Sequence, residues 1–77
     1  MPWWPALDRV ENELCDYLYS QPSNCAALDA ATAAVAAKLA ADRHYVWQRV
    51  WRLHEFGRTV TIIRAPDGSH LVRLIAN

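Results

Sequence analysis

The sequence has few of the residue patterns that catalysis or metal binding requires. Its 77 residues include only two glycines, and neither belongs to a glycine-rich loop that could hold a phosphate group. The two cysteines, Cys15 and Cys25, have no neighbouring histidine and match no zinc-binding spacing. The three histidines are scattered, and no two carboxylates are paired as a general acid and a general base. We therefore expect a protein that is not an enzyme and that holds neither a metal nor a cofactor.

Long apolar runs and export signals are also missing. The alanine-rich segment 26–41 is interrupted by Asp29, Thr32 and Lys38, so no stretch reaches membrane-spanning length. The N-terminus has no basic region followed by an apolar one, which is the pattern of a secretory signal. Without an export signal, free thiols are expected at both cysteines rather than a disulfide. The sequence thus predicts no membrane contact.

The charge is balanced overall but unevenly distributed. Residues 1–37 hold one basic and five acidic residues, a net charge of −4, whereas residues 38–77 hold seven basic and three acidic residues, a net charge of +4. Such an asymmetry is typical of a protein that turns one face towards a polyanion. A random split in a short chain would give the same pattern.

Helical periodicity begins at the N-terminus. Pro5 suits the first turn of a helix, where its missing N–H costs no hydrogen bond. We expect Glu11, Glu13 and Asp16 on the side of this helix that faces solvent. The first helix is predicted over about 5–20, and its apolar stripe is Leu7, Val10, Leu14, Tyr17 and Leu18.

The next segment leaves two interpretations open. Apolar residues at helical spacing favour a second helix over about 25–40, with Ser23 or Asn24 as its cap. The same residues also allow a short turn followed by a helix that Asp29 or Thr32 would cap. Periodicity alone does not separate one long helix from two shorter pieces.

The third helix and the segment after it have clearer boundaries. The third helix is predicted over about 43–56, with Asp42 as its N-terminal cap and Gly57 ending it in a left-handed conformation. Its buried stripe is Val46, Val50 and Leu53. Two β-branched, apolar runs at 59–64 and 70–75 flank Pro66-Asp67-Gly68, which predicts a β-hairpin over about 58–76.

Three helices followed by a hairpin is the order of a winged helix domain, and the sequence resembles the winged helix-turn-helix DNA-binding regulators at several positions. Lys38 matches the end of the helix that precedes the recognition helix, and Gly57 matches the glycine before the wing. Asp42 stands where a serine cap is common, and Ala40 where glycine is common. The resemblance implies one α+β domain over 1–77, with three helices and a C-terminal two-stranded β-hairpin wing.

The resemblance also implies a double-stranded DNA-binding protein, a cytoplasmic, nucleoid-associated transcriptional regulator whose third helix enters the major groove. Arginine can pair with guanine there and glutamine with adenine. The expected base-reading residues are Arg43, His44, Trp47 and Gln48. The residues expected to contact phosphate or to act from the wing are Lys38, Arg49, Arg52, Arg58, Arg64, His70 and Arg73.

Each of these assignments has a structural alternative. The polar residues of the third helix would also suit a solvated face, and the wing arginines would also suit an edge strand that must avoid aggregation. Trp47 and Trp51 lie on a face different from the buried stripe, so they favour either intramolecular packing or a protein-interaction module. A homodimer is expected, with Trp3, Trp4 and Leu7 at its interface. The alternative for Trp3 and Trp4 is intramolecular, with both side chains covering the hairpin or the first helix.

Overall fold

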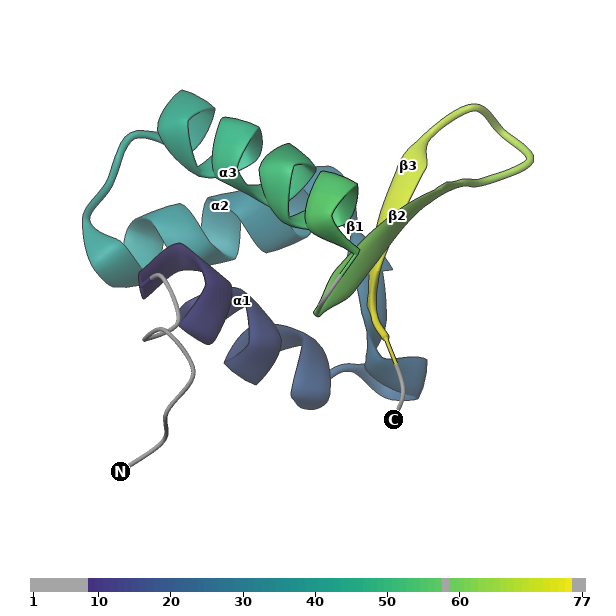
Figure 1. Cartoon of the computed structure of the whole chain (residues 1–77), viewed down its shortest axis with the longest axis horizontal. Helices are drawn as coiled ribbons and strands as arrows, with labels where there is room; N and C mark the ends of the chain where they lie inside the picture. Colours follow the sequence, from purple (N-terminus) through teal and green to yellow (C-terminus); the bar gives the residue numbers. More distant parts are fainter. Residues whose placement is uncertain (1–8, 58, 76–77) are drawn as a thin grey trace.

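In the part of the chain that the structure describes, three α-helices and a three-stranded antiparallel sheet form an α+β structure (Figure 1). The computed structural model describes residues 9–57 and 59–75. Its elements in chain order are α1 (Arg9–Tyr19), the short 3-10 turn η1 (Pro22–Asn24), β1 (Cys25–Ala27), α2 (Leu28–Leu39), α3 (Arg43–Phe56), β2 (Val60–Arg64) and β3 (His70–Leu74). This arrangement is compatible with a small winged helix-like fold.

The sheet differs from the two-stranded wing expected from the sequence. β2 and β3 do form the hairpin, with Ile62 opposite Val72 and Arg64 opposite His70. The other edge of β3 pairs with β1, where Ala26 lies opposite Val72. β3 is therefore the central strand of a three-stranded sheet, and the two-stranded wing is not confirmed.

The prediction of a second helix over about 25–40 was wrong at its start. Ser23 and Asn24 have left-handed backbone angles, with φ of 57° and 52°, and the chain then runs extended through β1. α2 begins only at Leu28, and the N-cap position belongs to Ala27, which offers no capping side chain. Asp29 therefore lies inside the first turn and does not cap the helix. Alanine favours helices, but pairing with β3 overrides that preference in residues 25–27.

The boundaries predicted for the third helix are confirmed. A carboxylate oxygen of Asp42 accepts the backbone N–H of Tyr45 at 3.1 Å, which satisfies one free donor of the first turn. Gly57 ends the helix with φ of 65°, and its N–H reaches the carbonyl of Leu53 at 3.1 Å. α3 is thereby fixed at both ends.

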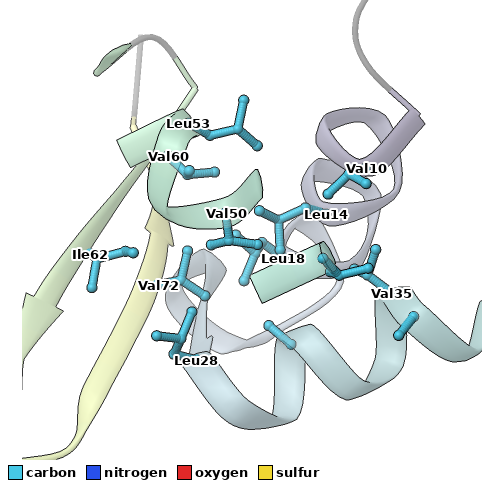
Figure 2. Close-up of a cluster of buried hydrophobic side chains, with 13 residues drawn as sticks. Val10, Leu14, Leu18, Leu28, Val35, Val50, Leu53, Val60, Ile62 and Val72 are labelled. Atoms are coloured by element: carbon cyan, nitrogen blue, oxygen red, sulfur yellow. The ribbon is translucent and has the colours of Figure 1, made fainter. Parts of the chain in front are cut away.

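The core lies where the three helices meet the sheet, and Figure 2 shows most of its side chains. Every helix and two of the strands contribute to it, and the predicted stripe of α3 is fully inside. The buried apolar residues are Val10, Leu14, Leu18, Leu28, Ala31, Val35, Ala36, Val46, Val50, Leu53, Val60, Ile62 and Val72. α3 therefore presents its remaining faces outward from a well-packed base.

One acidic residue was assigned to the wrong side of α1. Glu11 was expected to face solvent, but only 1% of its surface is exposed. Its carboxylate accepts the hydroxyl of Thr59 at 2.8 Å, just ahead of β2. A buried carboxylate needs such donors because burial removes its water.

Three further predictions concern the cysteines, the start of the first helix and membrane-spanning segments. Cys15 and Cys25 are free thiols, as expected. The first helix is described from Arg9 onward, so its predicted start at 5–8 lies outside the described residues. Within 9–57 and 59–75, no helix is long and apolar enough to cross a bilayer.

Candidate functional site

The outward side of α3 carries the residues that the sequence singled out for base reading. Val46, Val50 and Leu53 point into the core, and this fixes how the helix is turned. Arg43, His44, Trp47 and Gln48 consequently lie exposed along its first two turns. The third helix thus presents one guanidinium, one imidazole, one indole and one amide to the outside.

A row of aromatic rings runs along α3 towards the hairpin. His44 and Trp47 lie nearly parallel, with centroids 6.1 Å apart and planes inclined by 12°. Trp47 then meets Trp51 edge-on at 5.9 Å, and Trp51 meets His54 edge-on at 5.8 Å. Trp51 also contacts His70 of β3 at 5.4 Å. We call these five residues the aromatic row, and it joins α3 to the hairpin.

The two tryptophans of the row differ in burial. Trp51 is half-buried and packs against the core, so it satisfies the intramolecular alternative raised by the sequence. Its indole N–H is buried and finds no acceptor among the described residues. Trp47 remains 39% exposed. The indole open to a ligand is therefore that of Trp47.

A hydrogen bond sets the chemistry of the two exposed polar residues beside Trp47. The amide nitrogen of Gln48 lies 3.2 Å from Nε2 of His44. An amide nitrogen can only donate, so Nε2 of His44 accepts and the ring proton of the neutral imidazole lies on Nδ1. The second amide hydrogen of Gln48 and its carbonyl oxygen remain available to a partner.

Two hairpin residues that could bind phosphate, Arg64 and His70, lie on the same side as the aromatic row. Arg64 lies directly opposite His70, and partners opposite each other in an antiparallel pair project from the same face. Since His70 contacts Trp51, Arg64 belongs to the face of the hairpin that turns towards α3. Arg73 is separated from His70 by an odd number of positions, so it projects from the opposite face. The structure therefore brings Arg64 and His70 to the site and leaves Arg73 outside it.

The turn at the tip of the hairpin is held by its own hydrogen bonds. A carboxylate oxygen of Asp67 accepts the backbone N–H of Ser69 at 2.9 Å and its hydroxyl at 2.6 Å. These bonds with Ser69 lower the pKa of Asp67 below its ordinary value. Gly68 occupies a left-handed position with φ of 91° and donates to the carbonyl of Ala65 at 2.9 Å. The tip is therefore ordered and carries a negative charge close to Arg64.

The remaining basic residues are distributed around the molecule. Arg49 is half-buried and Arg52 is exposed, and at 100° per residue both fall on the flank of α3 away from Trp47. Lys38 lines a cavity of about 240 Å³ between α1 and α2, together with Glu13 and Asp16. Arg58 lies outside the described residues. The same is true of the residues expected at the dimer interface, Trp3, Trp4 and Leu7.

A second cavity adjoins the aromatic row, and no pattern in the sequence predicted it. It has a volume of about 390 Å³ and opens between the first turns of α2 and α3. Its lining combines two charges of opposite sign, a hydroxyl and two aromatic rings: Asp29, Thr32, Arg43, His44 and Trp47. Asp29 and Thr32 were expected only as possible helix caps. The pairing of α2 and α3 brings them to the base-reading end of α3.

Comparisons with known proteins do not assign this surface. No protein-family model matches the chain, and neither the curated proteins nor the solved structures contain a match to it. Within the described part of the chain, no three residues of the metal-binding types gather into a cluster.

Proposed function

We propose that the chain is a winged helix protein that binds double-stranded DNA and regulates transcription, with α3 in the major groove and the β2–β3 hairpin on the backbone or in the minor groove. The observation that most directly supports this proposal is that α3 and the hairpin form one surface. The ring centroids of Trp51 on α3 and His70 on β3 are 5.4 Å apart. Arg64 lies directly opposite His70 in this hairpin. Arg43 and Gln48 lie at the other end of the same surface.

The dimensions and charges of this surface suit a duplex. α3 has 14 residues and is therefore about 21 Å long at a rise of about 1.5 Å per residue. The major groove admits a helix of this kind. Arg43 and Arg64 are exposed, and no hydrogen bond or ion pair holds their side chains within the described residues. Unpaired guanidinium groups are available to phosphates and to guanine edges.

The residues divide into two proposed roles. Arg43 and Gln48 would read bases, since both end in planar groups that can form two hydrogen bonds with one base. Arg64 would hold phosphate, a contact that fixes the position of the protein without reading sequence. Asp67 at the hairpin tip would repel phosphate, so the contact is expected at Arg64 and not at the turn itself.

The test begins with selection of a preferred duplex from a random library, followed by titrations with variants. Arg43→Ala should weaken binding to the preferred site by about 1–3 kcal/mol and relax the preference at one base position. Arg64→Ala should weaken binding to all duplexes alike. Arg9→Ala is the matched control, because it removes the same charge from an exposed position in the acidic half. Undiminished binding by both Arg43→Ala and Arg64→Ala, or the same loss in Arg9→Ala, would refute the proposed interface.

A protein-interaction module is the second candidate, and a specific observation favours it. α3 exposes three large apolar side chains, namely Tyr45 at 49%, Trp47 at 39% and Phe56 at 74%. Salt dependence separates the two functions. Binding to DNA releases counterions, so its affinity falls steeply as the salt concentration rises. The affinity of a contact made by aromatic residues does not fall in this way. Failure to be retained on heparin, a polyanion, even at low salt would favour the protein-interaction module.

Dimerisation of the DNA-binding form is also proposed. A homodimer through Trp3, Trp4 and Leu7 would place two copies of α3 on a palindromic site. Removal of residues 1–4 should shift the sedimenting species towards the monomer. An intact chain that sediments as a monomer at high concentration would contradict the dimer.

A further inference from the structure

The cavity between the first turns of α2 and α3 has the size and lining of a binding site for a small planar molecule. Its volume of about 390 Å³ falls within the range of small-ligand sites, which is about 300–1,000 Å³. Its lining residues are Asp29, Thr32, Arg43, His44 and Trp47. From these side chains we infer that the cavity binds an unpaired guanine base, which belongs either to a free nucleotide or to a single strand. This site goes beyond duplex binding and does not depend on it.

The aromatic wall favours a flat ligand. His44 and Trp47 both line the cavity, and their rings are inclined by only 12° to each other. Trp47 keeps 39% of its surface exposed, so part of the indole is open to contact with another ring. Nucleobases stack on aromatic side chains in this way, and every base has the flat face that stacking needs. Stacking alone therefore selects a base without selecting which one.

The polar groups select the base. The hydroxyl hydrogen of Thr32 is donated to the carbonyl of Leu28 at 2.7 Å, which leaves only the lone pairs of its oxygen for the cavity. Asp29 offers a carboxylate, which when ionised can only accept, and Arg43 offers a guanidinium, which can only donate. α2 thus supplies acceptors and α3 supplies donors to the same space. A matching base must present donors and acceptors side by side.

Guanine meets this requirement best. Its N1–H and N2–H groups are adjacent donors that fit the two oxygens of a carboxylate, and its O6 and N7 atoms fit the fork of an arginine. Adenine offers one donor group, and thymine offers a single N–H between two acceptors. We therefore assign Asp29 to the N1 and N2 edge of guanine and Arg43 to its O6 and N7 atoms.

The same groups exclude phosphate and paired bases. A carboxylate in the cavity repels an anion, so Asp29 opposes a phosphate group there. In a duplex, N1–H and N2–H of guanine are bonded to cytosine and cannot reach Asp29. Arg43 also has its proposed role in reading duplex DNA. One guanidinium cannot serve both ligands at once, so guanine bound here would compete with the duplex.

The test is a titration of the isotope-labelled protein followed by amide and indole NMR signals. Guanosine 5′-monophosphate should shift the signals of Asp29, Thr32, Arg43 and His44 and the indole N–H of Trp47 in a saturable manner. Adenosine 5′-monophosphate and inorganic phosphate should produce much smaller shifts. Equal shifts with the adenine nucleotide, or the same shifts with inorganic phosphate alone, would overturn the assignment.

Two further ligands distinguish the source of the base. A thymine-only single strand with one dG should reproduce the shifts if the site takes bases from nucleic acid. If only the free nucleotide does so, the ligand is a small molecule, and the assignment of guanine stands in either case. The same dG paired with dC in a duplex should leave Asp29 unshifted, and an Asp29 shift of equal size would count against an unpaired base.

Variants separate recognition from folding. Asp29→Asn replaces one acceptor with a donor and should weaken the binding of guanosine 5′-monophosphate by about tenfold or more, since hydrogen bonds to a charged group are lost. Asp16→Asn is the matched control, because Asp16 is an exposed carboxylate that lines the other cavity. Trp47→Leu should weaken binding and Trp47→Phe should retain most of it. Unchanged affinity in Asp29→Asn, with a folded NMR spectrum, would refute the proposal even if duplex binding were intact.

Discussion

Nδ1 of His54 accepts the backbone N–H of Ile62 at 2.9 Å, and this bond ties the last turns of α3 to the outer edge of the sheet. β2 is an edge strand, because the sheet order is β1-β3-β2. An edge strand has N–H groups that no neighbouring strand satisfies, and the imidazole of His54 satisfies one of them. The same bond fixes the tautomer of His54, whose neutral ring must carry its proton on Nε2. The bond from Ile62 to His54 thus acts together with the contact between Trp51 and His70 to orient the hairpin relative to α3.

Replacement of His54 by leucine should loosen the hairpin from α3. The substitution removes the acceptor while keeping an apolar side chain of moderate size, so the half-buried N–H of Ile62 loses its partner. We expect the free energy of unfolding to fall by about 1–3 kcal/mol, and hydrogen exchange at the Ile62 amide to accelerate. His44→Leu is the control, because His44 is exposed and makes no bond to the sheet. Unchanged exchange at Ile62 in the His54 variant would show that the bond does not hold the hairpin.

The sequence predicted the parts of the fold that local chemistry determines. Asp42 and Gly57 bound α3 because a carboxylate cap and a left-handed glycine act within one turn of the helix. β1 was missed because its strand is specified by a partner more than 40 residues away, as Ala26 lies opposite Val72. Alanine carries no strand signal of its own. Long-range pairing of this kind cannot be obtained from the periodicity of the segment alone.

The buried carboxylate of Glu11 leads to a prediction about stability. Thr59→Val keeps the shape of the side chain but removes the hydroxyl that donates to Glu11 at 2.8 Å. We expect a loss of about 1–3 kcal/mol in urea unfolding, since a buried carboxylate then lacks one donor. Thr61→Val is the matched control, because Thr61 is half-buried on β2 but has only a long contact of 3.4 Å with His54. Equal losses in the two variants would mean that the bond to Glu11 contributes nothing specific.

Ala40 offers a position where the protein can be stabilised. It follows α2 in a left-handed conformation with φ of 52°, and the next residue closes the helix by donating to the carbonyl of Ala36 at 2.9 Å. This conformation is strained for alanine and free of strain for glycine. Ala40→Gly should raise the free energy of unfolding by about 0.5–1 kcal/mol. The opposite change is expected for Ala37→Gly, an exposed position inside the helix, where glycine should cost about 0.5–1 kcal/mol. A loss of stability in both variants would contradict this explanation of the helix end.

The candidate site was only partly predictable from the sequence, because some of its contacts, like the pairing of β1 with β3, join segments that are distant in the chain. Helical spacing was sufficient to place Arg43, Trp47 and Gln48 on the outside of α3, since the buried stripe fixes the rotation of the helix. Spacing could not show that Trp51 packs against His70, because that contact depends on how the hairpin folds back. It also could not bring Asp29 next to Arg43, since they belong to different helices. Properties of one helix follow from sequence, whereas properties of a surface between elements require the fold.

The thiol of Cys15 should react slowly at neutral pH. Partial burial raises the pKa of Cys15 above its ordinary value of 9.0, and the nearby carboxylate of Glu11 raises it further, while a hydrogen bond with Thr59 acts in the opposite direction. Because the thiolate is the reactive form, alkylation of the Cys25→Ser variant should be slow at pH 7 and should keep accelerating above pH 9. The sign for stability follows from the same shift. The folded state holds the proton more tightly than the unfolded state, so stability falls as pH rises past the ordinary value, and Cys15→Ser should remove that fall. A rate profile that levels off at the pH found for a free cysteine in a short peptide would contradict both expectations.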